Sequence, residues 1–116
     1  MNEAYVSYEI AKLLKKKGFD ERTFYHYTNC DVLQHNIVYN QYKNSEMLNA
    51  YSAPTHQMAC AWIREKGYHI YTFKGVDSWV YEVQSLNDDW TYHLGGFEDH
   101  DEAIEAAIKY CLENLI

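Results

Sequence analysis

The chain has 116 residues, 47% of them hydrophobic, which suffices for one domain with a continuous core. Its formal net charge of -7 argues against a broad nucleic-acid interface, because such interfaces carry a basic face. No run reaches the ~18 apolar residues of a membrane span, and the opening residues lack the basic start of a secretory signal. We therefore expect a single domain over residues 1–116, located in the cytoplasm and not in a membrane.

The first half of the chain predicts one helix, two strands and a long loop. Apolar residues at helical spacing indicate a helix over residues 2–17, closed by three lysines and Gly18. A strand is predicted over 23–27, and a second lies within 32–39. Residues 40–52 show little apolar periodicity and are predicted to form a functional or mobile loop.

The second half predicts a helix, three strands and a final helix. Ser52 is expected to cap a helix that begins near Ala53 and Pro54 and ends at Gly67. Residues 68–73, 79–86 and 90–94 then predict an antiparallel meander. A turn is expected at Gly95-Gly96, after which Asp99 or Asp101 caps the last helix.

These elements predict an α+β fold in the order α-β-β-α-β-β-β-α. The simplest assembly places all three helices on one face of a mainly antiparallel sheet of about five strands. Alternation along the meander then divides its side chains between two faces, and a slip of one residue would exchange the two sets. The inward set is Ile70, Tyr81, Val83, Trp90 and Tyr92, and the outward set is His69, Tyr71, Glu82, Gln84, Thr91 and His93.

Few residues indicate chemistry. His26, Cys30 and His35 could ligate zinc, but no second ligand pair is present, and we expect neither a metal nor a cofactor. Cys60 and Cys111 fall within helical periodicity, as free buried thiols do in a reducing compartment. No Gly-x-Ser-x-Gly or phosphate-binding glycine loop occurs, so no catalytic residues are predicted.

The aromatic content, with 12 tyrosines and 3 tryptophans, is the remaining unusual feature. Rigid amphipathic rings are favoured at recognition interfaces. They also serve in small cores where one end of the ring stays wet, and the composition supports both interpretations equally. The predicted binding residues are Tyr39, Tyr42 and Tyr51 around the loop, and His69, Tyr71, Glu82, Gln84 and His93 on the outward sheet face.

Two segments carry a resemblance to a known group of proteins. They run from Tyr51-Ser52-Ala53-Pro54-Thr55 through Trp62-Ile63-Arg64-Glu65, and from Glu105 to Leu115. The chain resembles small uncharacterised proteins encoded by phages, prophages and other mobile elements of gut anaerobic bacteria. The resemblance implies a bacterial or phage cytoplasmic setting and transfers no catalytic residues.

Three functions remain open from the sequence. The leading hypothesis is a non-enzymatic protein-interaction module whose partner is another protein, with a homodimer as one form of this. The alternative is a single-stranded nucleic-acid-binding domain that stacks bases on Tyr71 and its neighbours, although the acidic charge disfavours nucleic acid. The least favoured is a small metal-dependent hydrolase built on His26, His35 or His93.

Overall fold

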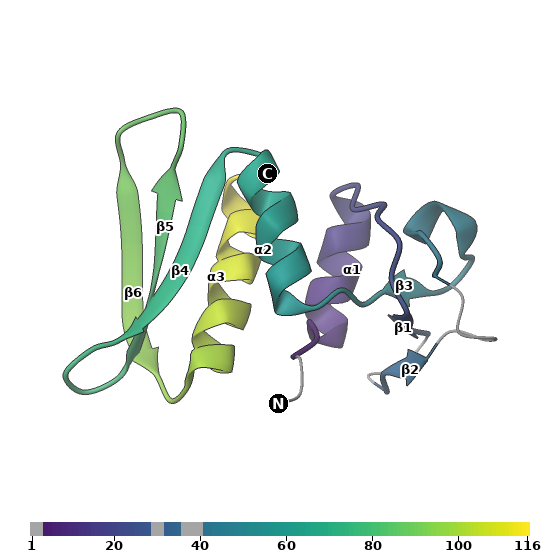
Figure 1. Cartoon of the computed structure of the whole chain (residues 1–116), viewed down its shortest axis with the longest axis horizontal. Coiled ribbons are helices and arrows are strands. Elements are labelled where there is room, and N and C mark those ends of the chain that lie inside the picture. Colours follow the sequence, from purple (N-terminus) through teal and green to yellow (C-terminus); the bar gives the residue numbers. More distant parts are fainter. Residues whose placement is uncertain (1–3, 29–31, 36–40) are drawn as a thin grey trace. The chain divides into compact units, whose positions relative to one another are not determined.

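The computed structural model of the protein describes residues 4–28, 32–35 and 41–116. Contacts divide the chain into two compact units, Met1–Thr55 and His56–Ile116. The α+β class and the order α-β-β-α-β-β-β-α are confirmed, with one short strand added before the second helix (Figure 1). The prediction of a single domain over residues 1–116 stays a prediction.

The first unit begins with helix α1, which spans Tyr8–Lys16. The Ser7 hydroxyl caps it by accepting from the Ile10 amide at 3.3 Å, so the helix begins six residues later than predicted. Its end matches the prediction. Gly18 adopts a φ of 96°, while the amides of Gly18 and Phe19 donate to the carbonyls of Lys15 and Leu14, which is the Schellman arrangement.

A small antiparallel sheet follows α1. Strand β1 (Tyr25–Tyr27) lies between β2 (Gln34–His35) and β3 (Tyr51–Ser52). A 3-10 helix, η2 (Asn44–Glu46), precedes β3. Within the described residues 41–52 of the predicted loop, η2 and β3 are the regular elements, and β3 corrects the prediction at its end because it pairs with β1.

Buried polar contacts explain why residues 41–52 are ordered. Asn44 is 4% exposed; its amide nitrogen donates to the Phe19 carbonyl and its oxygen accepts from the Ser52 amide, both at 2.8 Å. The Lys15 ammonium donates to the carbonyls of Met47 and Ala50 at 3.1 and 2.7 Å. The contacts with Phe19 and from Lys15 join residues 25 or more positions apart in the chain, which no local pattern could indicate.

The second unit begins with helix α2, His56–Glu65. The prediction that Ser52 caps this helix was wrong, because Ser52 lies in β3, four residues before the helix. Its buried hydroxyl has no hydrogen-bond partner in the described part of the chain. The predicted end at Gly67 is confirmed, since Gly67 adopts a φ of 106° and its amide donates to the Arg64 carbonyl.

Three strands form the second sheet, which has the order β4-β5-β6. They are β4 (Tyr68–Lys74), β5 (Trp79–Ser85) and β6 (Thr91–Phe97), paired antiparallel as predicted. The expected turn at Gly95-Gly96 was wrong. Both glycines belong to β6. The pairing of β6 with β5 shifts register between Trp79 and Tyr81 of β5, and Gly96 in the facing part of β6 adopts a φ of 98°.

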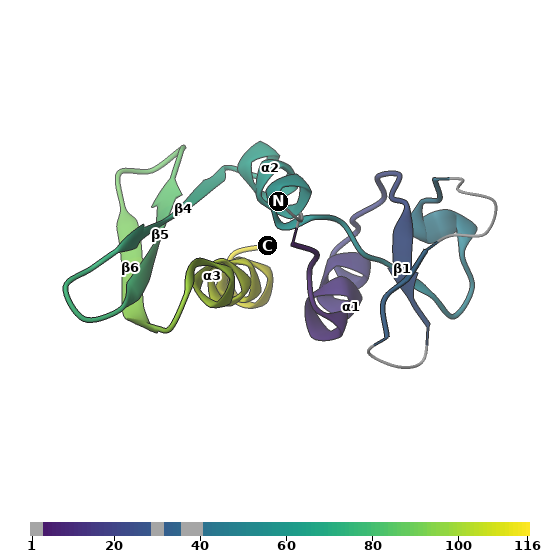
Figure 2. The ribbon, with the colours of Figure 1, turned by 60° about the horizontal axis from the view of Figure 1, so that its bottom comes forward.

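Helix α3, His100–Asn114, completes the second unit. Asp99 caps it by accepting from the Glu102 amide at 2.8 Å, as one of the two predicted caps. Both α2 and α3 contact β4, and α3 also contacts β5 and β6. Figures 1 and 2 show the two helices on the same side of the strands.

The strands form two separate three-stranded sheets, and the prediction of one sheet of about five strands was wrong in this respect. Period-2 patterning shows which residues share a face of a strand, but it does not show which strands pair. Here β1 pairs with β2 and β3, while the meander β4–β6 pairs only with itself. Helix α1 packs on β3 in the first unit, and α2 and α3 pack on the second sheet.

Candidate functional site: the open face of the β4–β6 sheet

The β4–β6 sheet has one covered and one uncovered face within residues 56–116, all of which the structure describes. The covered face carries Ile70, Tyr81 and Val83, all buried as predicted. Tyr92 also lies on this face, stacked on Tyr110 of α3 with ring centroids 4.5 Å apart. The side chains of the other face, here called the open face, are His69, Tyr71, Phe73, Val80, Glu82, Gln84, Thr91 and His93.

The strand register arranges the open face in rows. Tyr71 pairs with Glu82, and Glu82 pairs with His93, so these three side chains form the central row. In the neighbouring row, Gln84 lies between His69 and Thr91. Five predicted binding residues therefore lie together on one surface, as alternation along the strands indicated.

Hydrogen bonds fix the carboxylate at the centre of the open face. The Tyr71 hydroxyl donates a short hydrogen bond to Oε2 of Glu82, and the Gln84 amide donates to the same oxygen at 3.1 Å. The hydrogen bond from Tyr71 lowers the pKa of Glu82, and the same bond raises the pKa of Tyr71. The two neutral donors thus favour the ionised carboxylate, and the electrostatic effect of the nearby His93 lowers the pKa of Glu82 in the same direction.

Three aromatic rings follow one another along β4 on the open face. The rings of His69 and Tyr71 lie 5.9 Å apart, and those of Tyr71 and Phe73 lie 6.1 Å apart. Phe73 is 42% exposed. The Arg64 Nε donates to Nδ1 of His69 at 3.4 Å, so a guanidinium of the chain itself lies against the first of the three rings. We call these three rings the ring ladder.

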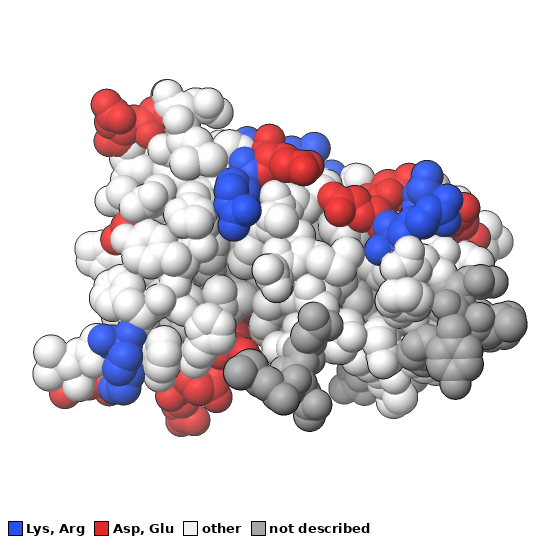
Figure 3. Space-filling view, viewed as in Figure 1, with Lys and Arg blue, Asp and Glu red and all other residues white. Residues whose placement is uncertain are grey.

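Charge is distributed unevenly along the chain. Residues 56–116 contain four lysines and arginines against eleven aspartates and glutamates, whereas residues 1–55 contain six of each. Around β4–β6, Figure 3 shows acidic side chains at the β5–β6 turn and near the start of α3, with a mainly uncharged surface over the strands. The field around the second unit therefore attracts cations.

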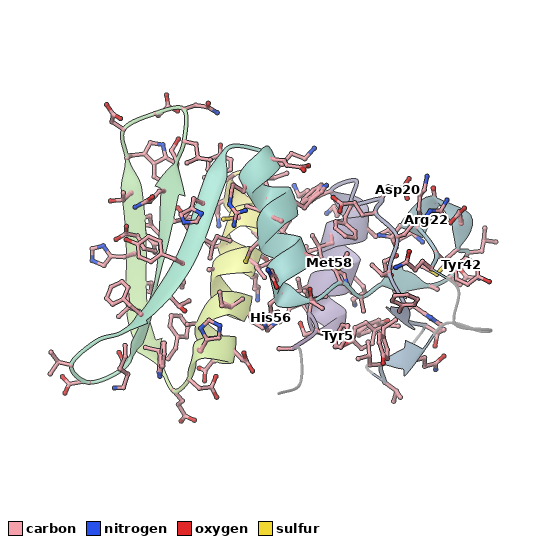
Figure 4. The ribbon with its side chains drawn as sticks, in the orientation of Figure 1. Tyr5, Asp20, Arg22, Tyr42, His56 and Met58 are labelled. Carbon is pink, nitrogen blue, oxygen red and sulfur yellow. The ribbon has the colours of Figure 1, made fainter. Side chains whose placement is uncertain are left out.

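The three tyrosines predicted near residues 40–52 belong to the first unit. Tyr39 lies outside the described residues. Tyr42 is half-buried and pairs through its backbone with Thr23. Tyr51 lies in β3, where its ring contacts that of Tyr8 and the Lys15 ammonium lies 5.4 Å from its centroid. The side chains of Asp20 and Arg22, labelled in Figure 4, bond to Ser45 and Glu46 of η2, respectively.

A second polar cluster, which the sequence did not reveal, involves His56, the first residue of α2 (Figure 4). Its Nε2 lies 2.7 Å from Oε2 of Glu105 on α3, and its Nδ1 lies 4.0 Å from Oδ1 of Asp101. It borders a cavity of about 360 Å³ whose lining includes Cys60 and His100. The histidine and Glu105 are 49 residues apart, so no motif spacing marked the pair.

Nucleophilic and metal chemistry receive no support from the described residues. Burial raises the pKa of Cys60 to about 11 and that of Cys111 to about 12, so both thiols stay protonated at neutral pH. Across residues 4–28, 32–35 and 41–116, no group of three or more His, Cys, Asp and Glu side chains could hold a metal ion. His26 lies in β1, the His35 backbone lies in β2, and Cys30 lies outside the described residues.

Within the described part of the chain, no helix has the length and apolar character that a membrane crossing requires. Searches against known proteins gave no relative from which a role could be transferred. No protein-family model, curated protein or solved structure matches the chain.

Proposed function

We propose that this chain is a non-enzymatic protein-interaction module that binds a segment of a partner protein on the open face of the β4–β6 sheet. The observation that carries this proposal is the combination of the ring ladder with the ordered row of Tyr71, Glu82 and His93 on a face that neither α2 nor α3 covers. Aromatic rings already held in place contribute contact area at little cost in conformational entropy. The polar row supplies directional hydrogen bonds among them.

The partner segment is expected to be basic. Residues 56–116 carry an excess of acidic side chains, and Glu82 places one carboxylate at the centre of the open face. Complementary charge steers association and rejects acidic competitors. The resemblance to phage-borne and prophage-borne proteins supports a setting in the cytoplasm of a bacterium, where the partner would be a host or phage protein.

The test begins with peptides selected from a random library on the immobilised full-length chain. We expect Tyr71→Ser to weaken the selected peptides about tenfold or more, because central aromatic residues dominate binding surfaces. Val76→Ser is the control, since Val76 lies in the β4–β5 turn and is 97% exposed. Near-UV circular dichroism of both variants verifies that the fold is intact.

Peptides that bind both variants as tightly as the unmodified chain would contradict the proposal. A second copy of the chain on the same face is a different outcome. Light scattering would then show a dimer that Tyr71→Ser dissociates and Val76→Ser leaves intact. That result would show that the open face binds a second copy of the chain and not another protein.

One observation favours a second function, the binding of single-stranded nucleic acid. The ring ladder presents neighbouring aromatic rings on one sheet face, and proteins that bind single strands without sequence preference stack successive bases on such rings. The acidic surroundings oppose phosphate groups, so we place this function second. Titration with oligothymidylate at low and high salt tests it, and salt-sensitive binding that Tyr71→Ser removes would support it over a protein partner.

A further inference from the structure

We propose that the open face recognises an arginine side chain of the partner, whose guanidinium pairs with the carboxylate of Glu82. This inference rests on the proposed protein-interaction function and specifies the chemistry that the partner presents. It starts from a carboxylate that is oriented but not neutralised.

Glu82 has hydrogen-bonding capacity to spare. Tyr71 and Gln84 both donate to Oε2, and no other hydrogen bond reaches the carboxylate from the described residues. A carboxylate offers about four acceptor positions on its two oxygens. Oε1 and the remaining capacity of Oε2 are therefore open to a donor that arrives from outside.

No positive side chain of the described residues forms an ion pair with Glu82. Arg64 donates to His69, and the Lys66 ammonium lies over the Trp62 ring at 4.8 Å. His93 lowers the pKa of Glu82 electrostatically but forms no hydrogen bond or ion pair with it among the described residues, and the two donors to the carboxylate are neutral. A cation from a partner would supply the missing charge without displacing a group of this chain.

The surroundings of Glu82 fit arginine better than lysine. A guanidinium is flat, donates several N–H bonds in fixed directions and stacks on aromatic faces, whereas an ammonium is a compact and strongly hydrated charge. Tyr71 and His93 flank Glu82 on the neighbouring strands. Beyond them, Phe73 pairs with Val80 and provides an apolar surface for the methylene groups of the arginine.

A matched set of peptides tests the inference on the full-length chain. The probe is a peptide of alternating threonine and arginine, compared with the same peptide carrying citrulline or lysine in place of arginine. Citrulline has nearly the shape of arginine but no charge. We expect the arginine peptide to bind about tenfold more tightly than the citrulline peptide, because a charge-assisted pair is lost.

Glu82→Gln should abolish the difference between arginine and citrulline, while the side chain can still accept from Tyr71. Asp89→Asn in the β5–β6 turn is the matched control, since it removes the same charge from an exposed position away from the open face. We expect it to preserve the preference for arginine. Amide-resolved NMR spectra of both variants verify the fold and show where each peptide binds.

The outcomes separate this inference from the function on which it rests. Equal binding of the arginine and citrulline peptides on the open face would overturn the role of Glu82 and leave the interaction surface standing. Lysine equal to arginine would show general charge attraction and overturn the specificity for guanidinium. Peptides that perturb only residues outside β4–β6, or that oligothymidylate displaces from the ring ladder, would count against both.

Discussion

Asn44 provides a sharp test of how the first unit is held together. Its amide group joins the carbonyl of Phe19 to the amide of Ser52, and the side chain is almost fully buried. Replacing Asn44 by alanine leaves one acceptor and one donor without a partner in a site from which water is excluded. Each unsatisfied group costs about 1–3 kcal/mol, so we expect Asn44→Ala to lower the free energy of unfolding by about 2–6 kcal/mol. Asn44→Asp keeps the acceptor for Ser52 but cannot donate to Phe19.

The assay is urea unfolding followed by two signals. All three tryptophans lie within residues 56–116, so tryptophan fluorescence reports on the second unit, whereas far-ultraviolet circular dichroism reports on both. If the chain is a single cooperative domain as predicted, Asn44→Ala shifts both signals together. If only circular dichroism shifts, the two units unfold separately.

Hydrogen exchange of the Ser52 amide measures the local effect of Asn44→Ala directly. The exposed Asn87→Ala serves as a control and should change stability by less than about 0.5 kcal/mol. A loss for Asn44→Ala as small as this, with an unchanged Ser52 amide, would refute the reasoning.

Four further predictions concern the second unit. Tyr71→Phe removes the main cause of the lowered pKa of Glu82, so this pKa should rise toward its ordinary value of 4.5. An NMR titration of the carboxyl carbon of Glu82 measures it, and an unchanged pKa would assign the shift to another cause. The pKa of Glu82 is lowered in the folded chain, so its ionised form stabilises the fold. In urea unfolding, the free-energy advantage of the unmodified chain over Glu82→Gln should be complete above pH 4.5 and decline as the pH falls through the lowered pKa. An advantage that increases with acidity would contradict this. Cys60 and Cys111 should not react with a thiol reagent at neutral pH until urea unfolds the chain, since burial keeps them protonated. Gly96→Ala should destabilise the chain by about 1 kcal/mol in thermal unfolding, because its φ of 98° disfavours a side chain, and an unchanged melting temperature would show that β6 relaxes there.

Local signals predicted the elements whose ends depend on nearby residues. The lysines and Gly18 indicated the end of α1, and Asp99 indicated the start of α3, because caps satisfy backbone groups within a few residues. Alternation also predicted which side chains of β4 and β5 point away from the helices. Tyr71 and Glu82 were placed on the same face because antiparallel neighbours share one register.

Features that depend on distant partners could not be predicted. Ser52 has the chemistry of a cap, yet its amide is bound by Asn44 and its backbone pairs with His26, so it forms a strand. The pairing of His56 with Glu105 joins two helices separated by a whole sheet in the sequence. Gly95-Gly96 was predicted as a turn because glycine in the left-handed region occurs both in turns and in bulges, and only the pairing with β5 distinguishes them.

The most direct measurement of the central claim maps a library-selected peptide onto the full-length chain by amide-resolved NMR. The account predicts that the largest shifts cluster on β4, β5 and β6, at His69, Tyr71, Glu82 and His93, and that Tyr71→Ser removes them. Shifts that avoid these strands, or that persist unchanged in Tyr71→Ser, would contradict it.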